Sequence, residues 1–287
     1  MKRNSGKRFG FFRNFSLFFL LVLSISNCKQ KVEGCLDIEA TNFAFSADES
    51  CPDDCCTYPN LTFEIAFRWD TLSLIYGNPY NLVDSTTVIK IMKTKFYISD
   101  ISLTNDNDSL MVLDRIELMV NDGSSGYETF VDDFTLMSRD FTSFNYEIGE
   151  IRGLGSFDSL RFFVGLSDLA NKVEPSSAPD GHPLSIQGDS MWSVEDAYVF
   201  NKLIMLPDTM TMPPTDTLTF NITDIAGERV EVVLPFKYEL EVGTDIQVRI
   251  IVDYFKWFQG IDFEDIPTEV VINNIVDNTI KAFSINE

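Results

Sequence analysis

The chain of 287 residues contains a single histidine, His182, and only five cysteines. With one histidine, no Ser-His-Asp or Cys-His arrangement of any specificity can be read along the chain, so we expect a protein that is not an enzyme. Basic residues are also few, 22 against 44 acidic ones, and the net charge is −22. Such a chain cannot neutralise phosphates, which argues against nucleic-acid binding. An acidic exterior fits a solvated exported protein with cations as partners.

The N-terminus has no apolar run long enough to span a bilayer as a helix. Five basic residues precede or flank FSLFFLLVL (Phe15 to Leu23), a pattern typical of a secretory signal. The sequence ISNC (Ile25 to Cys28) resembles a bacterial lipobox, although Asn27 departs from the usual Gly or Ala. We predict a signal peptide over residues 1–27 and a lipid anchor on Cys28 that holds the mature chain to a membrane. An ordinary secretory signal cleaved nearby is the alternative.

Four further cysteines cluster after Cys28 and are Cys35, Cys51, Cys55 and Cys56. An even number in an exported chain predicts two disulfides. Paired CxxC knuckles are missing and His182 is far away in sequence, which disfavours zinc. Adjacent cysteines rarely bond each other because the geometry is strained. We therefore expect Cys55 and Cys56 each to pair with one of Cys35 and Cys51.

Residues Gly34 to Pro59 resemble a short cysteine-bounded repeat of secreted and surface proteins of Gram-negative bacteria. The resemblance implies a stalk or spacer without catalysis, over residues 28–59, in an outer-membrane lipoprotein that faces either the periplasm or the exterior. Calcium is not excluded for the acidic residues of this segment or for DFEDIPTE (Asp262 to Glu269), but the EF-hand order of ligands is absent and solvated side chains are the better interpretation. The segment's acids are Asp37, Asp48, Asp53 and Asp54.

Many segments after Pro59 alternate apolar and polar residues with period two, as half-buried strands do. They are Thr62–Trp69, Val88–Leu103, Val112–Val120, Phe144–Ile151, Ser159–Leu166, Ala197–Leu206, Thr217–Thr223, Arg229–Phe236, Ile246–Tyr254 and Thr268–Asn273. Only Tyr254–Gly260 and Asn273–Phe283 suggest helix. Helical crossovers of the kind that parallel strands need are missing. We predict an all-β fold, an antiparallel β-sandwich over residues 60–287 with long loops.

The longest loop lies between Leu166 and Ala197, where about thirty residues lack clear periodicity; loops of this length are often functional. It contains GHPLSIQGDSMWSVEDAY (Gly181 to Tyr198). One interpretation packs Trp192 and Tyr198 into the core while His182 shapes the loop. The others are a metal site and a patch that binds a ligand or partner.

Several pieces of the chain, taken in order, are similar to the MbnP-like family. They are KFYISDISL (Lys95–Leu103), LRFFVGLSDLAN (Leu160–Asn171), HPLS (His182–Ser185), SMWSVEDAYVFNKL (Ser190–Leu203) and DNTIKAFSI (Asp277–Ile285). The resemblance spans Leu61 to Ile285 and implies a periplasmic or lipid-anchored β-sandwich. For some members it also implies a copper site, built from histidines and a tryptophan that a di-haem partner protein oxidises to kynurenine.

Carried over residue by residue, His182 takes the position of the family's HPL histidine, Trp192 the first tryptophan and Tyr198 the tyrosine. The chain departs from the pattern at four places: Ser190 replaces Met, Met191 replaces Tyr or His, Val194 replaces the second Trp, and Ala197 replaces Gly. Copper needs two or more nitrogen or sulfur donors, so the candidate site is His182 with Met191 and an oxidised Trp192. The alternative function is a surface module that binds a protein or glycan through its loops.

Overall fold

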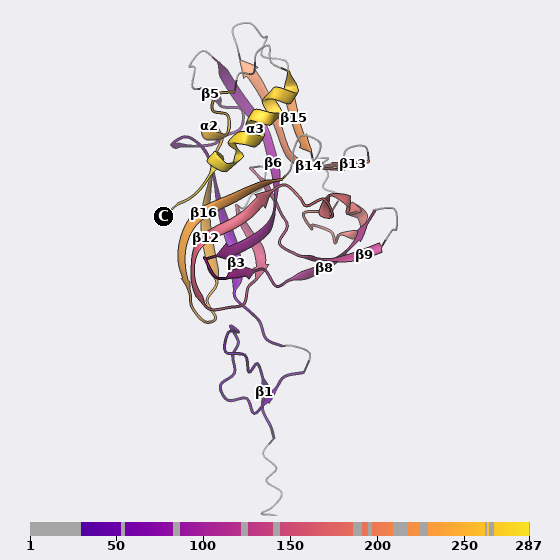
Figure 1. The fold of residues 1–287 in the computed structure, drawn as a ribbon, viewed down its shortest axis with the longest axis vertical. Helices are drawn as coiled ribbons and strands as arrows, with labels where there is room; N and C mark the ends of the chain where they lie inside the picture. The colour runs from indigo at the N-terminus through magenta and orange to yellow at the C-terminus, as the bar shows by residue number, and fades with distance from the viewer. Residues whose placement is uncertain are drawn as a thin grey trace, which may run out of the picture. The chain divides into compact units, whose positions relative to one another are not determined.

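A computed structural model of the chain describes residues 30–52, 55–82, 87–121, 126–139, 144–185, 191–194, 197–208, 217–223, 229–261, 263 and 267–286 (Figure 1). These residues fall into two compact units. The small unit lies within residues 30–56 and excludes Ile38–Asn42; the large unit holds Ile38–Asn42 and the described residues from Thr57 onward. No described helix is both long and apolar enough to cross a membrane. Cys28 lies outside the described residues, so its lipid anchor stays a prediction.

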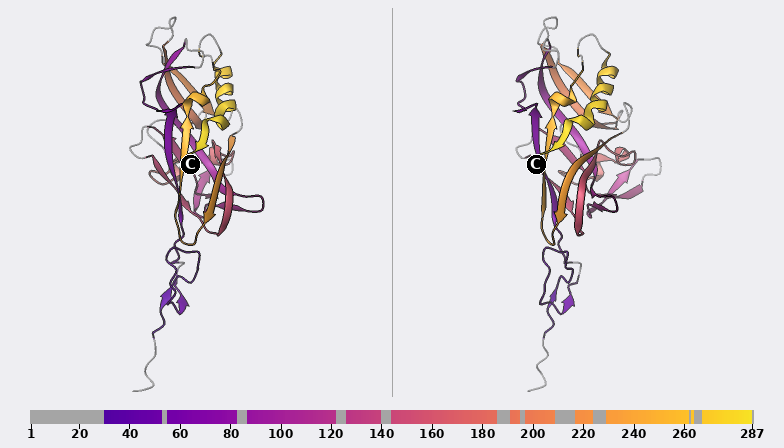
Figure 2. Two further views of the ribbon diagram at one scale, coloured as in Figure 1. Left: turned by 90° about the vertical axis from the view of Figure 1, so that its left-hand side faces the viewer. Right: turned by 60° about the vertical axis from the view of Figure 1, so that its left-hand side comes forward.

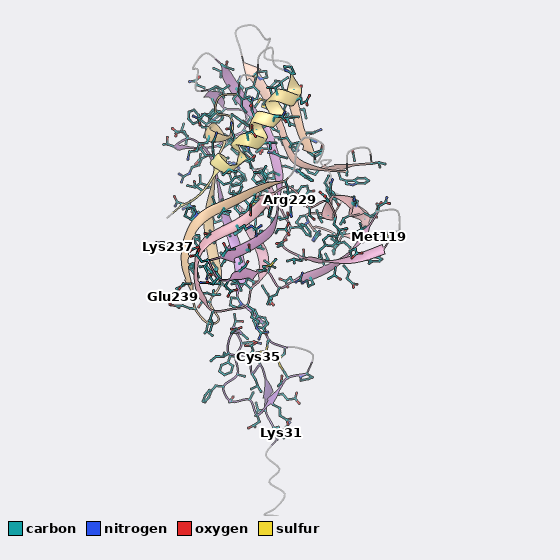
Figure 3. All side chains as sticks on the ribbon, viewed as in Figure 1. Lys31, Cys35, Met119, Arg229, Lys237 and Glu239 are labelled. Atoms are coloured by element: carbon teal, nitrogen blue, oxygen red, sulfur yellow. A yellow bond between two sulfur atoms is a disulfide. The ribbon has the colours of Figure 1, made fainter. Side chains whose placement is uncertain are left out.

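Two disulfides hold the small unit together and confirm the expected pairing. Cys35 bonds to Cys56 and Cys51 bonds to Cys55. In the same unit, β1 (Glu33–Gly34) pairs in parallel with β2 (Glu49–Ser50). A side chain at Gly34 would come within 2.7 Å of the Ala44 Cβ, so the close approach of these segments requires glycine there. Figure 3 labels Cys35 in this unit.

The large unit is the predicted β-sandwich. Its larger layer is a nine-stranded sheet made of β5 (Pro79–Asn81), β6 (Val88–Thr104), β7 (Ser109–Met111), β10 (Thr135–Ser138), β12 (Gly155–Val164), β13 (Trp192–Ser193), β14 (Ala197–Asp208), β15 (Leu218–Thr223) and β16 (Val230–Leu240). The second layer is a five-stranded sheet made of β3 (Asn60–Trp69), β4 (Leu72–Ser73), β11 (Asn145–Glu150), β17 (Ile246–Asp253) and β18 (Phe283–Ile285). A separate hairpin joins β8 (Arg115–Val120) to β9 (Gly126–Val131). Figure 2 shows the two layers from two further directions.

Alternation of side chains builds the core between the two sheets. Every second residue of β3 is buried, from Leu61 to Trp69. On β16, Val232 and Leu234 point inward, whereas Lys237 and Glu239 are exposed and are labelled on that strand in Figure 3. The main hydrophobic cluster draws residues from both layers, as period-two strands that pack face to face require.

One pair of neighbouring strands in the described part of the sandwich breaks the antiparallel expectation. Strand β17 runs parallel to β3, in register from Ile246 beside Leu61 to Asp253 beside Arg68. A parallel pair needs a long connection, usually a helix. Here most of the domain lies between β3 and β17 in the sequence and supplies that connection. A parallel pair could therefore form although the sequence shows no helical crossovers.

The predicted strand at Thr268–Asn273 is wrong, because these residues begin helix α3 (Thr268–Ala282). The buried residues Val271, Ile275, Thr279 and Ala282 lie three or four positions apart, on one face of the helix. The short helix α2 (Tyr254–Trp257) packs against α3, and the Trp257 Nε1–H donates to the Ile275 carbonyl oxygen and to the Thr279 hydroxyl, each at 3.1 Å. The helices predicted at Tyr254–Gly260 and Asn273–Phe283 are therefore present as α2 and α3, and α3 begins at Thr268, earlier than predicted.

Candidate functional site

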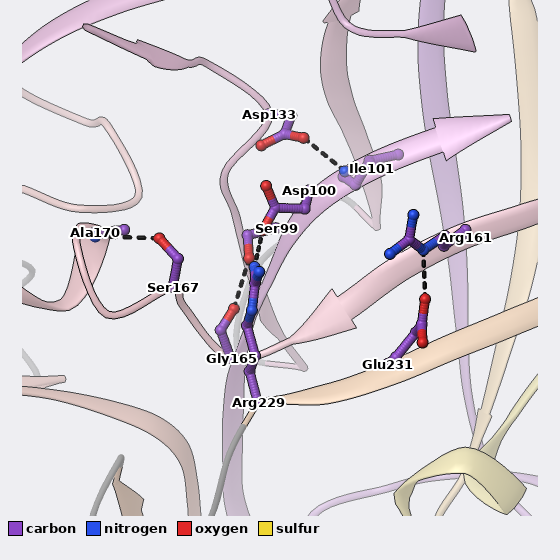
Figure 4. Close-up of polar contacts among 10 residues, drawn as sticks. All are labelled: Ser99, Asp100, Ile101, Asp133, Arg161, Gly165, Ser167, Ala170, Arg229 and Glu231. Atoms are coloured by element: carbon purple, nitrogen blue, oxygen red, sulfur yellow. Dashed lines mark hydrogen bonds and ion pairs between the residues drawn. The ribbon is translucent and has the colours of Figure 1, made fainter. Parts of the chain in front are cut away.

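The long strand β6 contains a bulge that shapes its surroundings. Between two successive residue pairs of the β6–β12 ladder, β6 advances by three residues, from Ser102 to Ser99. Over the same step β12 advances by only two, from Arg161 to Phe163. Asp100, within the bulge, has a φ of +52°, in the left-handed region. The Ile101 N–H donates to a carboxylate oxygen of Asp133 at 2.6 Å (Figure 4). Asp133 thus satisfies an amide at the point where a bulge disturbs the ladder.

Asp133 is a buried carboxyl group. Its side chain belongs to a residue that is 1% exposed, and burial raises the pKa of this carboxyl to about 7. Figure 4 also shows the Asp100–Arg229 ion pair beside it and the Ser99 hydroxyl, which donates to the Gly165 carbonyl at 2.8 Å. The Ser99 bond holds the end of β12 against the middle of β6, and the ion pair holds Arg229, just before β16, against the bulge.

Two buried tyrosines hold the loop that carries His182. The Tyr198 hydroxyl donates to the Leu184 carbonyl oxygen at 2.7 Å, and the Tyr97 hydroxyl donates to the Pro183 carbonyl oxygen at 3.2 Å. The two rings meet edge to face, with centroids 5.8 Å apart. Burial raises the pKa of both phenols well above the usual value, so they act only as neutral hydrogen-bond donors and acceptors here. The Asn171 side-chain oxygen accepts from the Tyr198 N–H at 3.1 Å.

The imidazole of His182 is 8% exposed and uses both ring nitrogens. Its Nδ1 accepts the Leu184 N–H at 3.1 Å, and its Nε2 lies 2.9 Å from an Asp132 carboxylate oxygen. Because Nδ1 is an acceptor, the ring proton is on Nε2 and is donated to Asp132. His182 is therefore a positioned neutral imidazole that joins its loop to the segment before β10.

A cleft of about 910 Å³ opens next to this histidine, between β10 and β11. These strands lie at edges of the two different sheets, each paired with a single neighbour, so the cleft is an opening between the layers. His182 and Pro183 form part of its wall. The Tyr146 hydroxyl of β11 crosses between the layers, accepting the Ser138 N–H at 3.2 Å and donating to the Ser138 carbonyl at 3.1 Å.

The lining of the cleft is acidic. Among the described residues that form it there are four carboxylates and no lysine or arginine; the carboxylates are Asp114, Asp132, Glu147 and Glu150. Asp114 accepts the Glu150 N–H at 2.7 Å, which ties the segment before β8 to the end of β11. Gly149 permits this contact, since a Cβ there would lie 2.6 Å from an Asp114 carboxylate oxygen.

The family model MbnP matches residues 58–274. The chain belongs to the MbnP family. Among solved structures it is similar to MbnP from Methylosinus trichosporium, with a TM-score of 0.39 and 15% identity over 71% of this chain and 78% of that chain. No curated protein matches the chain. The MbnP match covers the His182 loop, Tyr198 and the whole lining of the cleft.

The residues predicted to bind copper in this MbnP family member have other roles in the structure. Met191 is 2% exposed and belongs to a second hydrophobic cluster with Leu184 and Tyr198. Trp192 packs on the same cluster and pairs with Tyr198 through β13, while Val194 is exposed. Ser190 lies outside the described residues. Both ring nitrogens of His182 are engaged, by the Leu184 N–H and by Asp132, and no three His, Cys, Asp or Glu residues in the described part of the chain gather as a metal site. Copper binding stays a prediction.

Sequence reasoning did not find the other residues of the cleft in this MbnP domain. Asp132 and Thr135 belong to VDDFT (Val131 to Thr135), which runs from the last residue of β9 to the first of β10, two short strands that the alternation did not predict. Glu147 lies on an alternating strand, where it could not be distinguished from the other outward-facing polar residues. Only the loop residue His182 carried a signal, because it is the single histidine and lies in a family motif.

Proposed function

We propose that the protein is an exported, lipid-anchored envelope protein of the MbnP family that binds a ligand, without catalysis, in the cleft between β10 and β11. The observation that carries this proposal is the cleft itself: about 910 Å³, lined by acidic and aromatic residues and bordered by the His182 loop. Binding pockets for small ligands fall in this range of volume.

The state of His182 favours binding over catalysis. A general base needs a ring nitrogen whose lone pair can take a proton from substrate. The Nδ1 lone pair of His182 accepts a hydrogen bond from a backbone N–H. Nε2 carries the ring proton and donates it in a hydrogen bond to Asp132. The imidazole therefore supports the wall of the cleft and holds Asp132 in place.

Ligand binding in the cleft is tested by an NMR fragment screen on the soluble Cys28→Ser form. We expect hits that shift resonances of Tyr146, Glu147 and His182. Glu147→Trp places a bulky ring in the lining and should abolish these shifts. Glu239→Trp, on the exposed face of β16, is the matched control and should preserve them. Hits that do not respond to Glu147→Trp, or a screen without hits at these residues, would overturn the proposal.

The lipid anchor is tested by detergent-phase partition of the full chain made in a Gram-negative host. The native chain should enter the detergent phase, and Cys28→Ser should move it to the aqueous phase. Asn27→Gly restores the usual lipobox residue and should keep the chain in the detergent phase. Equal partition of the native chain and Cys28→Ser would show that the acylation prediction is wrong.

Copper binding is the second candidate, supported by family membership together with the presence of His182, Met191 and Trp192 in the motif order. It requires the His182 ring to release Asp132 or Leu184, because a metal needs a nitrogen lone pair. Metal analysis and intact mass of protein purified from its native envelope test it. Bound copper lost in His182→Gln would support the site; an absence of copper together with an unmodified Trp192 would exclude it.

A further inference from the structure

The four carboxylates of the cleft come from neighbouring segments of the chain: Asp114 accepts the Glu150 N–H at 2.7 Å with its carboxylate and the Asp132 N–H at 2.9 Å with its carbonyl oxygen. Asp114 precedes β8, Asp132 follows β9, and Glu147 and Glu150 lie on β11. No three acidic residues in the described part of the chain come together as a metal site. Four carboxylates that line one opening without forming a metal site suit a ligand whose positive charge is spread over several groups, because each charge can then meet its own carboxylate.

The described lining of the cleft has no cationic side chain to offset these acids. The described lining residues include no lysine or arginine, and the tautomer of His182 makes its imidazole uncharged. Asp114 and Asp132 each have a hydrogen bond within the protein, from a backbone amide and from the uncharged ring, so neither of these two partners carries a positive charge. The cleft is therefore a local excess of negative charge in a protein that is already acidic.

A second observation points to a ligand with hydrogen-bond donors or acceptors. Thr135 on β10 lines the cleft, is 4% exposed, and its hydroxyl oxygen has no hydrogen-bond partner among the described residues. Buried hydroxyls in proteins are nearly always satisfied, so an unsatisfied one beside a cleft is a place where a bound group can supply the missing bond. Phe134 and Tyr146 add aromatic surface to the same lining, which attracts cations.

We propose that the cleft binds a small organic cation with two or more ammonium groups, a polyamine-like ligand, and that Thr135 accepts one of its N–H groups. This inference rests on the proposed function, because it names the class of ligand for the same site. The volume of about 910 Å³ accommodates an extended molecule of this kind, whereas a single metal ion would fill only a small part of it.

Calorimetric titration of the soluble Cys28→Ser form with spermidine tests the proposal. We expect saturable binding with one molecule per chain that weakens as salt is raised. Glu147→Gln should weaken it about 10-fold, and Thr135→Val, which keeps the shape of the side chain, about 5-fold. Glu239→Gln removes an acid on the exposed face of β16 and should leave affinity within about two-fold of the parent. Thermal melting establishes that each variant folds. If Thr135→Val does not fold, the affinity of Glu147→Gln for spermidine decides the proposal.

Three results would overturn the proposal: no saturable binding of spermidine, equal weakening by Glu147→Gln and Glu239→Gln, or tight binding of Ca²⁺ that Glu147→Gln removes. The neutral probe 1,8-octanediol separates this failure from failure of the proposed function. If neutral fragments occupy the cleft and spermidine does not, the cleft is a ligand site of another chemical class. If neither does, both proposals fall.

Discussion

The Tyr198 hydroxyl donates a hydrogen bond to the Leu184 carbonyl oxygen across a distance of 2.7 Å. Both residues belong to pieces of the chain that carry the family resemblance, and Tyr97 and Asn171 extend the contact to two further pieces. Segments that are far apart in sequence therefore meet at one buried set of hydrogen bonds. This arrangement gives the motif a structural role that does not depend on a metal, namely holding the His182 loop at the wall of the cleft.

Replacing Tyr198 with Phe removes that bond while keeping the ring that packs on Tyr97. The Leu184 carbonyl is then left without its buried donor, so we expect the free energy of unfolding to fall by about 1–3 kcal/mol. Urea unfolding followed by tryptophan fluorescence measures it. Tyr127→Phe, at an exposed position of β9, removes the same hydroxyl from the surface and should change stability by less than about 0.5 kcal/mol. Equal effects of the two substitutions would show that the Tyr198 bond contributes nothing.

Asp133 should make stability depend on pH. Burial raises its pKa from 3.8 to about 7 in the folded protein, so between these values the folded state holds a proton that the unfolded chain has lost. The contribution of Asp133 to stability is therefore fully present below about pH 4 and is lost as pH rises through about 7.

Asp133→Asn removes this titration and keeps an oxygen that can accept the Ile101 N–H. Relative to the parent, the variant should gain about 1–3 kcal/mol of stability between pH 5 and pH 8, measured by urea unfolding at both values. Asp106→Asn, at an exposed position, is the control and should show no such change. A difference between parent and Asp133→Asn that is the same at both pH values would contradict the proposed burial of a titrating carboxyl.

Period-two alternation predicted the fold well where a strand has one buried and one outward face, as β3 and β16 do. It missed β10, whose four residues are all buried, because a short strand covered on both faces has no alternation. It also misread the start of α3, since Thr268 to Asn273 contains several β-branched residues whose strand preference is overridden by packing against α2.

The candidate site could be predicted only in part. His182 was recognisable as the single histidine in a motif-bearing loop. The acids that line the cleft with it include Asp114 before β8, Asp132 after β9 and Glu147 on β11, and no spacing in the sequence links the three. The β8–β9 hairpin sets Asp132 beside Asp114, and the bond from the Glu150 N–H to Asp114 brings both to β11 at the opening between the layers.

The two disulfides should contribute unequally to the small unit. Cys35–Cys56 closes a loop with a sequence separation of 21, whereas Cys51–Cys55 spans only 4. Chain-entropy estimates give about 3 kcal/mol for the longer loop and about 2 kcal/mol for the shorter. The double variant Cys35→Ser/Cys56→Ser should therefore be cleaved faster by protease within residues 30–56 than Cys51→Ser/Cys55→Ser. Peptide mapping without reduction checks the pairing first; recovery of a Cys35–Cys55 peptide would contradict it.

The hydroxyl of Thr279 should stabilise the packing of α2 on α3. It accepts the Trp257 Nε1–H at 3.1 Å and donates to the Ile275 carbonyl at 3.0 Å. Thr279→Val keeps the shape and leaves Trp257 its second acceptor, the Ile275 carbonyl, so we expect a loss of only about 1 kcal/mol in urea unfolding. Trp257→Ala empties a buried ring position and should cost about 3–5 kcal/mol. Ile280→Val, on the exposed face of α3, should change stability by less than about 0.5 kcal/mol. If Thr279→Val lost no more stability than Ile280→Val, the Trp257 ring would be held by packing and by the Ile275 carbonyl alone, without a contribution from the Thr279 hydroxyl.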